Sequence, residues 1–281
     1  AMVGATLGEL DIPDIKLICL DLDGTLLNSS KRVSQGNQVA IKRALDAGIK
    51  VAIASGRHPF NIAETADSLG LPHTAVCLSG AYVMIGGSEA FRHGLSDEGV
   101  QKVIDTAAEH QCYISLAGGD FNLCAGYIER KGGETPATRR YIRLDSYDAL
   151  REEAQKHKGL FLKGAVHHDN PAVYEAVKQR LSRIDDIEAV QSDVCWCDTI
   201  AKGCSKAEGV AALAKALGHT MGEVAALGDD ENDVELISEA GLGIAMGNAL
   251  PQVKTVAKAQ TLDNDHDGVA YTIDKILERR A

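Results

Sequence analysis

The chain has 281 residues, of which 45% are hydrophobic and 25% are charged, and its formal net charge is -11 at pH 7. This composition is typical of a globular protein with one large or two medium domains. Without a Lys/Arg-rich run, such an acidic chain is a poor partner for nucleic acid or for an anionic membrane surface. No apolar run has the length of a membrane span and the first residues lack the pattern of a signal peptide, so we expect a cytoplasmic protein.

The first part of the chain alternates between strand and helix patterns. Strands are predicted at 16–20, 49–54 and 74–78, with helices at about 35–47 and 59–69 between them. Such alternation predicts parallel strands joined by right-handed crossovers, with helices on both faces of one sheet.

The character of the sequence changes between about 86 and 198, where glycine-rich turns become frequent. The elements predicted there are strands such as 113–117 and 160–166 and helices around 97–109, 146–157 and 171–182. We interpret this segment as an inserted α+β domain.

Adjacent His167 and His168 fall in what we expect to be a solvated turn, because neighbouring strand residues point to opposite faces and do not share a metal ion.

The alternation resumes after residue 202. Strands are predicted at 223–227 and 242–246, among helices at 206–217, 231–239, about 249–257 and 268–279. In the last helix an apolar stripe from Val269 to Leu277 can dock against the sheet. The sequence therefore predicts an α/β protein with a doubly wound, Rossmann-like parallel-sheet core of residues 1–85 and 199–281, and an inserted domain at 86–198.

The seven cysteines are scattered, and most lie inside apolar runs, where cysteine behaves as a small hydrophobic residue. We expect them to be reduced. Cys195 and Cys197 share one face of a strand, but no second pair stands at a spacing that would complete a zinc site.

The most informative stretch is the apolar run 16–20, which stops on Asp21 and Asp23 and is followed by Gly24 and Thr25. Two carboxylates at the end of a buried strand are costly unless a cation compensates them, because burial and mutual repulsion both oppose ionisation. The simpler alternative for this motif alone is a solvated, Asp-rich turn.

Two further strand ends carry polar groups. Ser55 and Gly56 follow the strand 49–54 and offer a hydroxyl and a backbone N–H to a phosphate oxygen, and an acidic run from Asp229 to Asp233 follows the strand 223–227. The carboxyl ends of strands in an open parallel sheet share one crevice, where ligands bind. We therefore expect these groups to meet.

Lys206 supplies a cation for the same crevice. Ser205 and Glu208 have the spacing of a capping box, which places Lys206 in the first turn of a helix, where its charge and the free backbone donors both attract an anion. Each group alone has a simpler explanation as a turn, a helix cap or a solvated helix start. Their combination at successive strand ends predicts a site for a phosphate and a metal ion.

This combination resembles the haloacid dehalogenase superfamily of phosphatases, specifically its Cof-like branch, in which a subclass IIB cap domain is inserted after the third core strand. The four motifs of that family correspond here to Asp21–Thr25, Ser55–Arg57, Lys206 and Gly228–Asp233. Two further segments, Met246–Ala249 and Asn264–Ala270, are also typical of the branch. Ser79 departs from it, because asparagine is common at this position near the expected junction of core and cap.

The resemblance implies a chemical role for each acidic residue. Asp21 would attack phosphorus and form an aspartyl-phosphate, and Asp23 would protonate the leaving alcohol and then activate the hydrolytic water. Mg²⁺ would be held by a carboxylate oxygen of Asp21, the backbone carbonyl of Asp23 and the carboxylate of Asp229. Asp233 would orient the lysine or the metal-bound waters. The groups implied to bind the phosphoryl oxygens are Ser55, Lys206, Asn232 and backbone N–H groups near Leu22 and Gly56.

The function so predicted is Mg²⁺-dependent hydrolysis of a small phosphorylated metabolite, with a sugar phosphate as the default. Cap residues that could contact the leaving group are Asp120, Asn122, Arg130, Lys163 and His167. Two alternatives stay open, a phosphomutase of the same fold and a non-hydrolytic, receiver-like phospho-acceptor domain. A halide-removing enzyme is disfavoured, because it would give Asp23 no leaving group to protonate. The sequence does not predict the oligomeric state.

Overall fold

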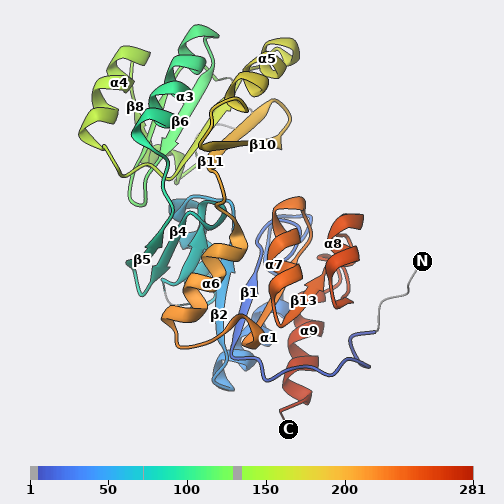
Figure 1. Ribbon diagram of the computed structural model, residues 1–281. Helices are drawn as coiled ribbons and strands as arrows, with labels where there is room; N and C mark the ends of the chain where they lie inside the picture. Colours follow the sequence, from blue (N-terminus) through green and yellow to red (C-terminus); the bar gives the residue numbers. More distant parts are fainter. Residues whose placement is uncertain (1–5, 72, 129–134, 281) are drawn as a thin grey trace. The chain divides into compact units, whose positions relative to one another are not determined.

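The computed structural model describes residues 6–71, 73–128 and 135–280. The chain divides into two compact units (Figure 1). The first unit contains the chain up to Arg57, residues Ile62–Phe91, and the chain from Ser205 onward. The second contains His58–Asn61 and Arg92–Cys204.

The first unit is built on a sheet that has eight strands within the described residues, in the order β14-β13-β12-β1-β2-β3-β4-β5. The strands are β1 Leu17–Leu20, β2 Lys50–Ala54, β3 Ala75–Cys77, β4 Tyr82–Ile85, β5 Ser88–Arg92, β12 Val224–Gly228, β13 Leu242–Ala245 and β14 Ala259–Gln260. Strands β14 to β3 run parallel, whereas β4 is antiparallel to β3. The predicted doubly wound parallel core is confirmed.

Helices cover both faces of this sheet, because the chain winds in opposite directions away from β1 and β12. On one side α1 (Gln35–Asp46) packs against α9 (Gly268–Glu278), and on the other α7 (Val234–Glu239) packs against both α6 (Lys206–Ala216) and α8 (Pro251–Val256) (Figure 1). The unit also contains most of α2, Pro59–Ser68.

The local sequence explains why these elements form. All four residues of β1 are buried, as expected for a central parallel strand covered on both faces. The side chain of Ser34 accepts a hydrogen bond from the Asn37 backbone and caps α1. Ser205 caps α6 in the same way, through the backbone N–H of Glu208, as the sequence predicts. In α9, Val269, Ile273 and Ile276 are buried, whereas Leu277 is only half-buried.

The second unit has its own six-stranded sheet, counted over the described residues, in the order β10-β11-β9-β6-β7-β8. Its strands are β6 Tyr113–Ala117, β7 Asn122–Ala125, β8 Ile142–Arg143, β9 Lys163–His167, β10 Ile187–Asp193 and β11 Trp196–Ala201. Its helices are α3 Asp97–Glu109, α4 Tyr147–Lys156 and α5 Pro171–Leu181, and α3 packs against the other two. The pairing is antiparallel except between β7 and β8.

The structure differs from the sequence-based expectation at the start of the inserted segment. The sheet of the first unit continues through β4 and β5 to Arg92, so the boundary expected at 85/86 falls inside a hairpin. Its turn is Gly86-Gly87, whose φ values of 58° and 84° suit glycine. The Gly86-Gly87 pair therefore marks a hairpin turn and not a change of domain.

The expectation for His167 was also wrong. It is the last residue of β9 and not part of a solvated turn. Its ring stacks on Trp196 with the centroids 4.6 Å apart, its Nδ1 lies 2.7 Å from the Cys195 carbonyl oxygen, and its Nε2 lies 2.9 Å from Asp169 Oδ1. The contacts to Cys195 and Trp196, which lie in the β10–β11 segment far along the chain, hold it in the strand.

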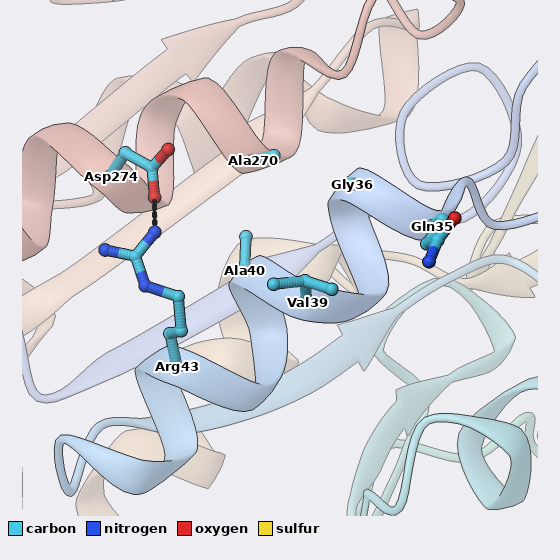
Figure 2. Close-up of a pocket in the computed structure, with 7 residues that line it drawn as sticks. All are labelled: Gln35, Gly36, Val39, Ala40, Arg43, Ala270 and Asp274. Carbon is cyan, nitrogen blue, oxygen red and sulfur yellow. Dashed lines mark hydrogen bonds and ion pairs between the residues drawn. The ribbon is translucent and has the colours of Figure 1, made fainter.

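A shallow groove of about 390 Å³ lies between α1 and α9 (Figure 2). Arg43 Nη1 donates to Asp274 Oδ1 across one end of it, at 2.6 Å, and Val39 lies at its edge. None of the candidate site residues lines this groove. It therefore takes no part in the site described below.

All seven cysteines are buried and unpaired, as expected for reduced thiols. Among the described residues, no helix combines the length and the hydropathy that crossing a bilayer requires.

Candidate active site

Asp21 lies where the strand order reverses. It is the first residue after β1, and its backbone N–H donates to the carbonyl of Leu227 in β12 at 3.1 Å. The carboxyl ends of β1 and β12 therefore meet at this residue, which is the position where open parallel sheets bind ligands. The residue is 8% exposed, so its carboxylate is largely removed from water.

Lys206 joins two carboxylates from the first turn of α6. Its Nζ donates to Asp21 Oδ1 and to Asp233 Oδ1, at 2.7 Å in each case, and the residue is only 1% exposed. The start of α6 sits tightly on the turn that contains Gly80. A Cβ at Gly80 would lie 1.8 Å from the Ser205 carbonyl oxygen, so glycine is required there for this close approach.

Asp233 holds the acidic loop after β12 in shape. Its Oδ2 accepts hydrogen bonds from the backbone N–H groups of Asp229 and Asp230, at 3.0 and 3.1 Å, while its Oδ1 faces Lys206. Asp229 is fixed separately, because its Oδ1 accepts a hydrogen bond of 2.9 Å from the buried Thr25 hydroxyl. The loop after β1 and the loop after β12 are thereby linked.

The electrostatics of this cluster favour a cation. Burial, together with the neighbouring carboxylates, raises the pKa of Asp21 well above 3.8, and burial likewise raises the pKa of Asp229. Burial alone would lower the pKa of Lys206, but Asp21 and Asp233 outweigh it and raise that pKa. Three carboxylates thus lie together with one ammonium group, which pairs with two of them, and negative charge remains in excess.

The donor set fits a hard divalent cation. One side-chain oxygen from each of Asp21, Asp229 and Asp233 lies within 4.8 Å of the others. Oxygen ligands with net negative charge are those that Mg²⁺ and Ca²⁺ prefer. The chain therefore offers a candidate metal site at the ends of β1 and β12.

Asp23 points its carboxylate to different partners. Arg57 donates from Nε to Oδ2 at 2.8 Å and from Nη2 to Oδ1 at 2.7 Å, and Lys31 Nζ donates to Oδ1 at 3.1 Å. Partial burial opposes ionisation, but these two cations outweigh it and lower the pKa of Asp23. The sequence places Arg57 in a motif with Ser55 and Gly56, but it does not predict this ion pair. The signal for this contact is that Arg57 follows β2, the strand that pairs with β1, so both residues lie near the same strand ends.

The other predicted phosphate-binding residues lie around the same strand ends. Ser55 directly follows β2, is 2% exposed, and accepts a hydrogen bond of 3.1 Å from the Arg57 backbone N–H. Gly56 comes next and is half-buried. Leu22 is fully buried between the two aspartates, whereas the side chain of Asn232 is exposed on the turn Glu231–Asp233.

Ser79 occupies an unusual backbone conformation. Its φ and ψ are 58° and 33°, and its N–H donates to the Ser55 carbonyl at 3.1 Å. Asparagine is enriched in this left-handed region. This preference is a physical reason for the asparagine that is common at this position in the Cof-like branch. The serine keeps the conformation although its side chain favours it less.

The candidate leaving-group residues belong to the second unit. Lys163 Nζ lies 2.6 Å from Asp198 Oδ2 on neighbouring strands, and Asn122 is 4% exposed with no hydrogen-bond partner for its Oδ1 among the described residues. Asp120 is exposed. Arg130 lies outside the described residues.

Comparison with known proteins identifies the family. Residues 18–273 match the sequence model of the haloacid dehalogenase-like hydrolases. The chain belongs to this family. The 5-amino-6-(5-phospho-D-ribitylamino)uracil phosphatase YcsE of Bacillus subtilis is 32% identical over 262 residues, covering 92% of this chain and 95% of that protein.

Solved structures of this family share the fold. A haloacid dehalogenase-like hydrolase from Bacteroides thetaiotaomicron is 28% identical, with a TM-score of 0.80 over 93% of this chain and 99% of that one. The subclass IIB sugar phosphatase BT4131 has the same fold, with 20% identity and a TM-score of 0.75, over 92% of this chain and 98% of that one. The resemblance to the Cof-like branch is confirmed, and the protein is a phosphoric monoester hydrolase of this superfamily.

Proposed function

We propose that the protein hydrolyses the phosphate monoester of a small metabolite through an aspartyl-phosphate formed on Asp21, and that it requires Mg²⁺. The observation that carries this proposal is the position of the Asp21 carboxylate. It lies at a topological switch point, bonded to Lys206 and within 4.8 Å of oxygens of Asp229 and Asp233. A nucleophilic carboxylate beside a lysine and two further acids matches what phosphoryl transfer needs, namely positioning and neutralisation of charge.

In the first step, a carboxylate oxygen of Asp21 forms a bond to phosphorus while the bond from phosphorus to the ester oxygen breaks. The leaving oxygen takes a proton from the carboxyl group of Asp23 and departs as an alcohol. Arg57 and Lys31 lower the pKa of Asp23, so these contacts disfavour the protonated form that this step uses.

In the second step, water attacks phosphorus and transfers its proton to the carboxylate of Asp23. The acyl-phosphate bond breaks, inorganic phosphate leaves, and the carboxylate of Asp21 is regenerated. The ion pair with Arg57 favours the ionised Asp23 that this step requires.

Mg²⁺ would be held by the carboxylates of Asp21 and Asp229 and by the backbone carbonyl of Asp23, as the family resemblance implies. When bound, the cation would neutralise charge on the phosphoryl oxygens. We assign the remaining contacts to those oxygens to Lys206, to Ser55, and to Asn232 with backbone N–H groups near Leu22 and Gly56. Asp233 would keep Lys206 and the Asp229 loop in place, through the hydrogen bonds that it already makes to both.

We propose a sugar-derived phosphate ester as the substrate, with the second unit, which contains Arg92–Cys204, as the cap that selects it. The support comes from the Bacillus subtilis relative YcsE, which is named as a phosphatase of a phosphoribityl compound. Family members differ in substrate more than in chemistry, so a panel of sugar, sugar-alcohol, nucleotide and vitamin phosphates is the direct test.

The test of the chemistry uses an aryl phosphate in the presence of Mg²⁺. Asp21→Asn should abolish turnover, whereas Asp14→Asn, at an exposed aspartate that pairs with Lys16 and Arg280, should not. Retention of more than about a tenth of the parent activity by Asp21→Asn would refute the assigned nucleophile. Repeated turnover without a sugar-phosphate acceptor would exclude a phosphomutase, and a single burst of product would favour a receiver-like acceptor.

A further inference from the structure

Two asparagines far along the chain donate hydrogen bonds to the loop that follows β1. Asn248 Nδ2 donates to the Gly24 carbonyl at 2.8 Å, and Asn264 Nδ2 donates to the Leu27 carbonyl at 3.0 Å. The two asparagines also contact each other, since the Asn264 backbone N–H donates to Asn248 Oδ1 at 3.0 Å. Both lie in segments that resemble the Cof-like branch, and the chemistry proposed above gives neither of them a role.

The held loop contains the proposed nucleophile and the acid. Within it, the backbone N–H of Leu26 donates to the Asp21 carbonyl and that of Leu27 to the Leu22 carbonyl. The Gly24 carbonyl accepts the hydrogen bond from Asn248. Gly24 has a φ of 75°, which glycine adopts without strain.

The segment around Asn248 is also tied to the second acidic loop. The Met246 backbone N–H donates to the Gly228 carbonyl at 3.0 Å, and the Leu250 N–H donates to the Asp229 carbonyl at 2.9 Å. Asn248 therefore links the strand end that carries Asp229 to the peptide that follows Asp23. The relative position of the two loops sets the distance between the proposed metal ligands.

The exposure of Asn248 argues against a purely structural role. Its side chain is exposed, yet both of its polar ends are used in defined hydrogen bonds. An exposed hydrogen bond adds little to the stability of a fold, because water replaces it when it is lost. Such a contact matters more where a small displacement changes the geometry of a catalytic loop.

We infer that Asn248 is a positioning residue, which fixes the Gly24 peptide and thereby the two loops that would hold the phosphoryl group and Mg²⁺, with Asn264 as its support at Leu27. This inference rests on the proposed function. Asn248 itself touches neither the substrate nor the reacting atoms. Its loss should act on kcat and on the affinity for Mg²⁺ more than on the stability of the protein.

The experiment compares Asn248→Ala and Asn264→Ala with Gln252→Ala, which removes an exposed amide from α8 and leaves the Asn248 contacts in place. We expect Asn248→Ala to lower kcat for an aryl phosphate, and to raise the Mg²⁺ concentration for half-maximal activity, by roughly 10- to 100-fold. The KM for the ester should change less than kcat. Asn264→Ala should change both quantities in the same direction and by less, and the control should match the parent.

A second readout does not depend on activity. The melting temperature of the metal-free variants should equal that of the parent, whereas the Mg²⁺ concentration that gives half of the Mg²⁺-induced rise in melting temperature should increase for Asn248→Ala. An unchanged kcat and an unchanged Mg²⁺ response would overturn the inference. So would a lowered melting temperature with an unchanged kcat, because that result describes a structural residue.

If Asn248→Ala does not fold, Asn248→Ser is measured in its place against the same expectations. Failure of the proposed function gives a different pattern, because the parent would then lack Mg²⁺-dependent turnover. A parent that is active beside an equally active Asn248→Ala contradicts only the inference.

Discussion

Arg57 donates hydrogen bonds to both carboxylate oxygens of Asp23, from Nε to Oδ2 at 2.8 Å and from Nη2 to Oδ1 at 2.7 Å. This pair favours the anionic form of the residue that we propose as acid and base. A bidentate pair of this kind is stronger and more directional than a single contact. The two residues follow neighbouring strands, β1 and β2. The guanidinium therefore controls the charge of the residue that must both give and take a proton.

Arg57→Ala should move the acidic limb of the pH–kcat profile to higher pH. Arg57 lowers the pKa of Asp23, and the base role needs the ionised form, which is lost as the pH falls through that pKa. Without the guanidinium the pKa rises toward its ordinary value of 3.8 or above, so activity is lost at a less acidic pH. At saturating Mg²⁺, which holds Asp21 and Asp229 in their ionised form, steady-state rates between about pH 3 and pH 8 measure this shift.

The matched control for that measurement is Arg43→Ala. Arg43 also pairs with one aspartate, Asp274, but lies in the groove between α1 and α9 and not at the strand ends (Figure 2). Its profile should match that of the parent. An unmoved acidic limb in Arg57→Ala would show that another group sets it.

Asp229→Asn should stabilise the metal-free protein at neutral pH. Burial raises the folded-state pKa of Asp229 above 3.8, so its contribution to stability is present below that value and is lost as the pH rises through the raised pKa. At neutral pH the ionised group costs free energy. The amide removes this cost and can keep the hydrogen bond from Thr25, so the free energy of unfolding should rise by roughly 0.5–2 kcal/mol.

Urea denaturation in the presence of a chelator measures that change. Because Asp229 is only half-buried, water still solvates part of its charge, and the gain should lie toward the lower end of the range. The same variant should lose most of the stabilisation that Mg²⁺ gives the parent. A destabilised Asp229→Asn would mean that burying the ionised Asp229 side chain does not carry this cost.

The stabilisation of the parent by Mg²⁺ should increase with pH. Asp21 and Asp229 both have raised pKa values, so protons compete with the cation for these carboxylates in acidic solution. Thermal melts with and without Mg²⁺ should therefore show a larger shift near neutral pH than near about pH 5. An equal shift at both values would argue against binding through these two residues.

Lys206→Met should both inactivate and destabilise the protein. The ammonium is the buried partner of Asp21 and Asp233, and its removal leaves two carboxylates without their counter-charge. Breaking a buried ion pair in this way lowers the free energy of unfolding by about 3–5 kcal/mol. Lys215→Met, at the exposed end of α6, is the control and should behave like the parent. A fully stable Lys206→Met would contradict the role of this lysine in holding the site.

The sequence predicted the arrangement of the core well because its signals are local. The run before Asp21 is apolar on both strand faces. The capping role of Ser205 can be predicted from Glu208, which stands only three positions later. The rule that parallel strand ends share a crevice then correctly predicted that Asp21, Lys206 and Asp229 meet.

What the sequence could not predict depends on contacts between distant residues. Asn248 meets Gly24 across 224 positions, and nothing near either residue indicates the contact. The pairing of Arg57 with Asp23 depends on how a long, flexible side chain turns at the end of β2. The β4–β5 hairpin was missed because its Gly86-Gly87 turn looks like a linker when the sheet is not known.

The most direct measurement is to identify the phosphorylated residue. The protein with Mg²⁺ and an aryl phosphate is quenched in acid during turnover, reduced with borohydride, digested and mapped by mass spectrometry. We expect the reduced product of an aspartyl-phosphate at position 21 in the parent and its absence from Asp21→Asn. A phosphoryl group on any other residue, or none at all in an enzyme that turns over, would contradict it.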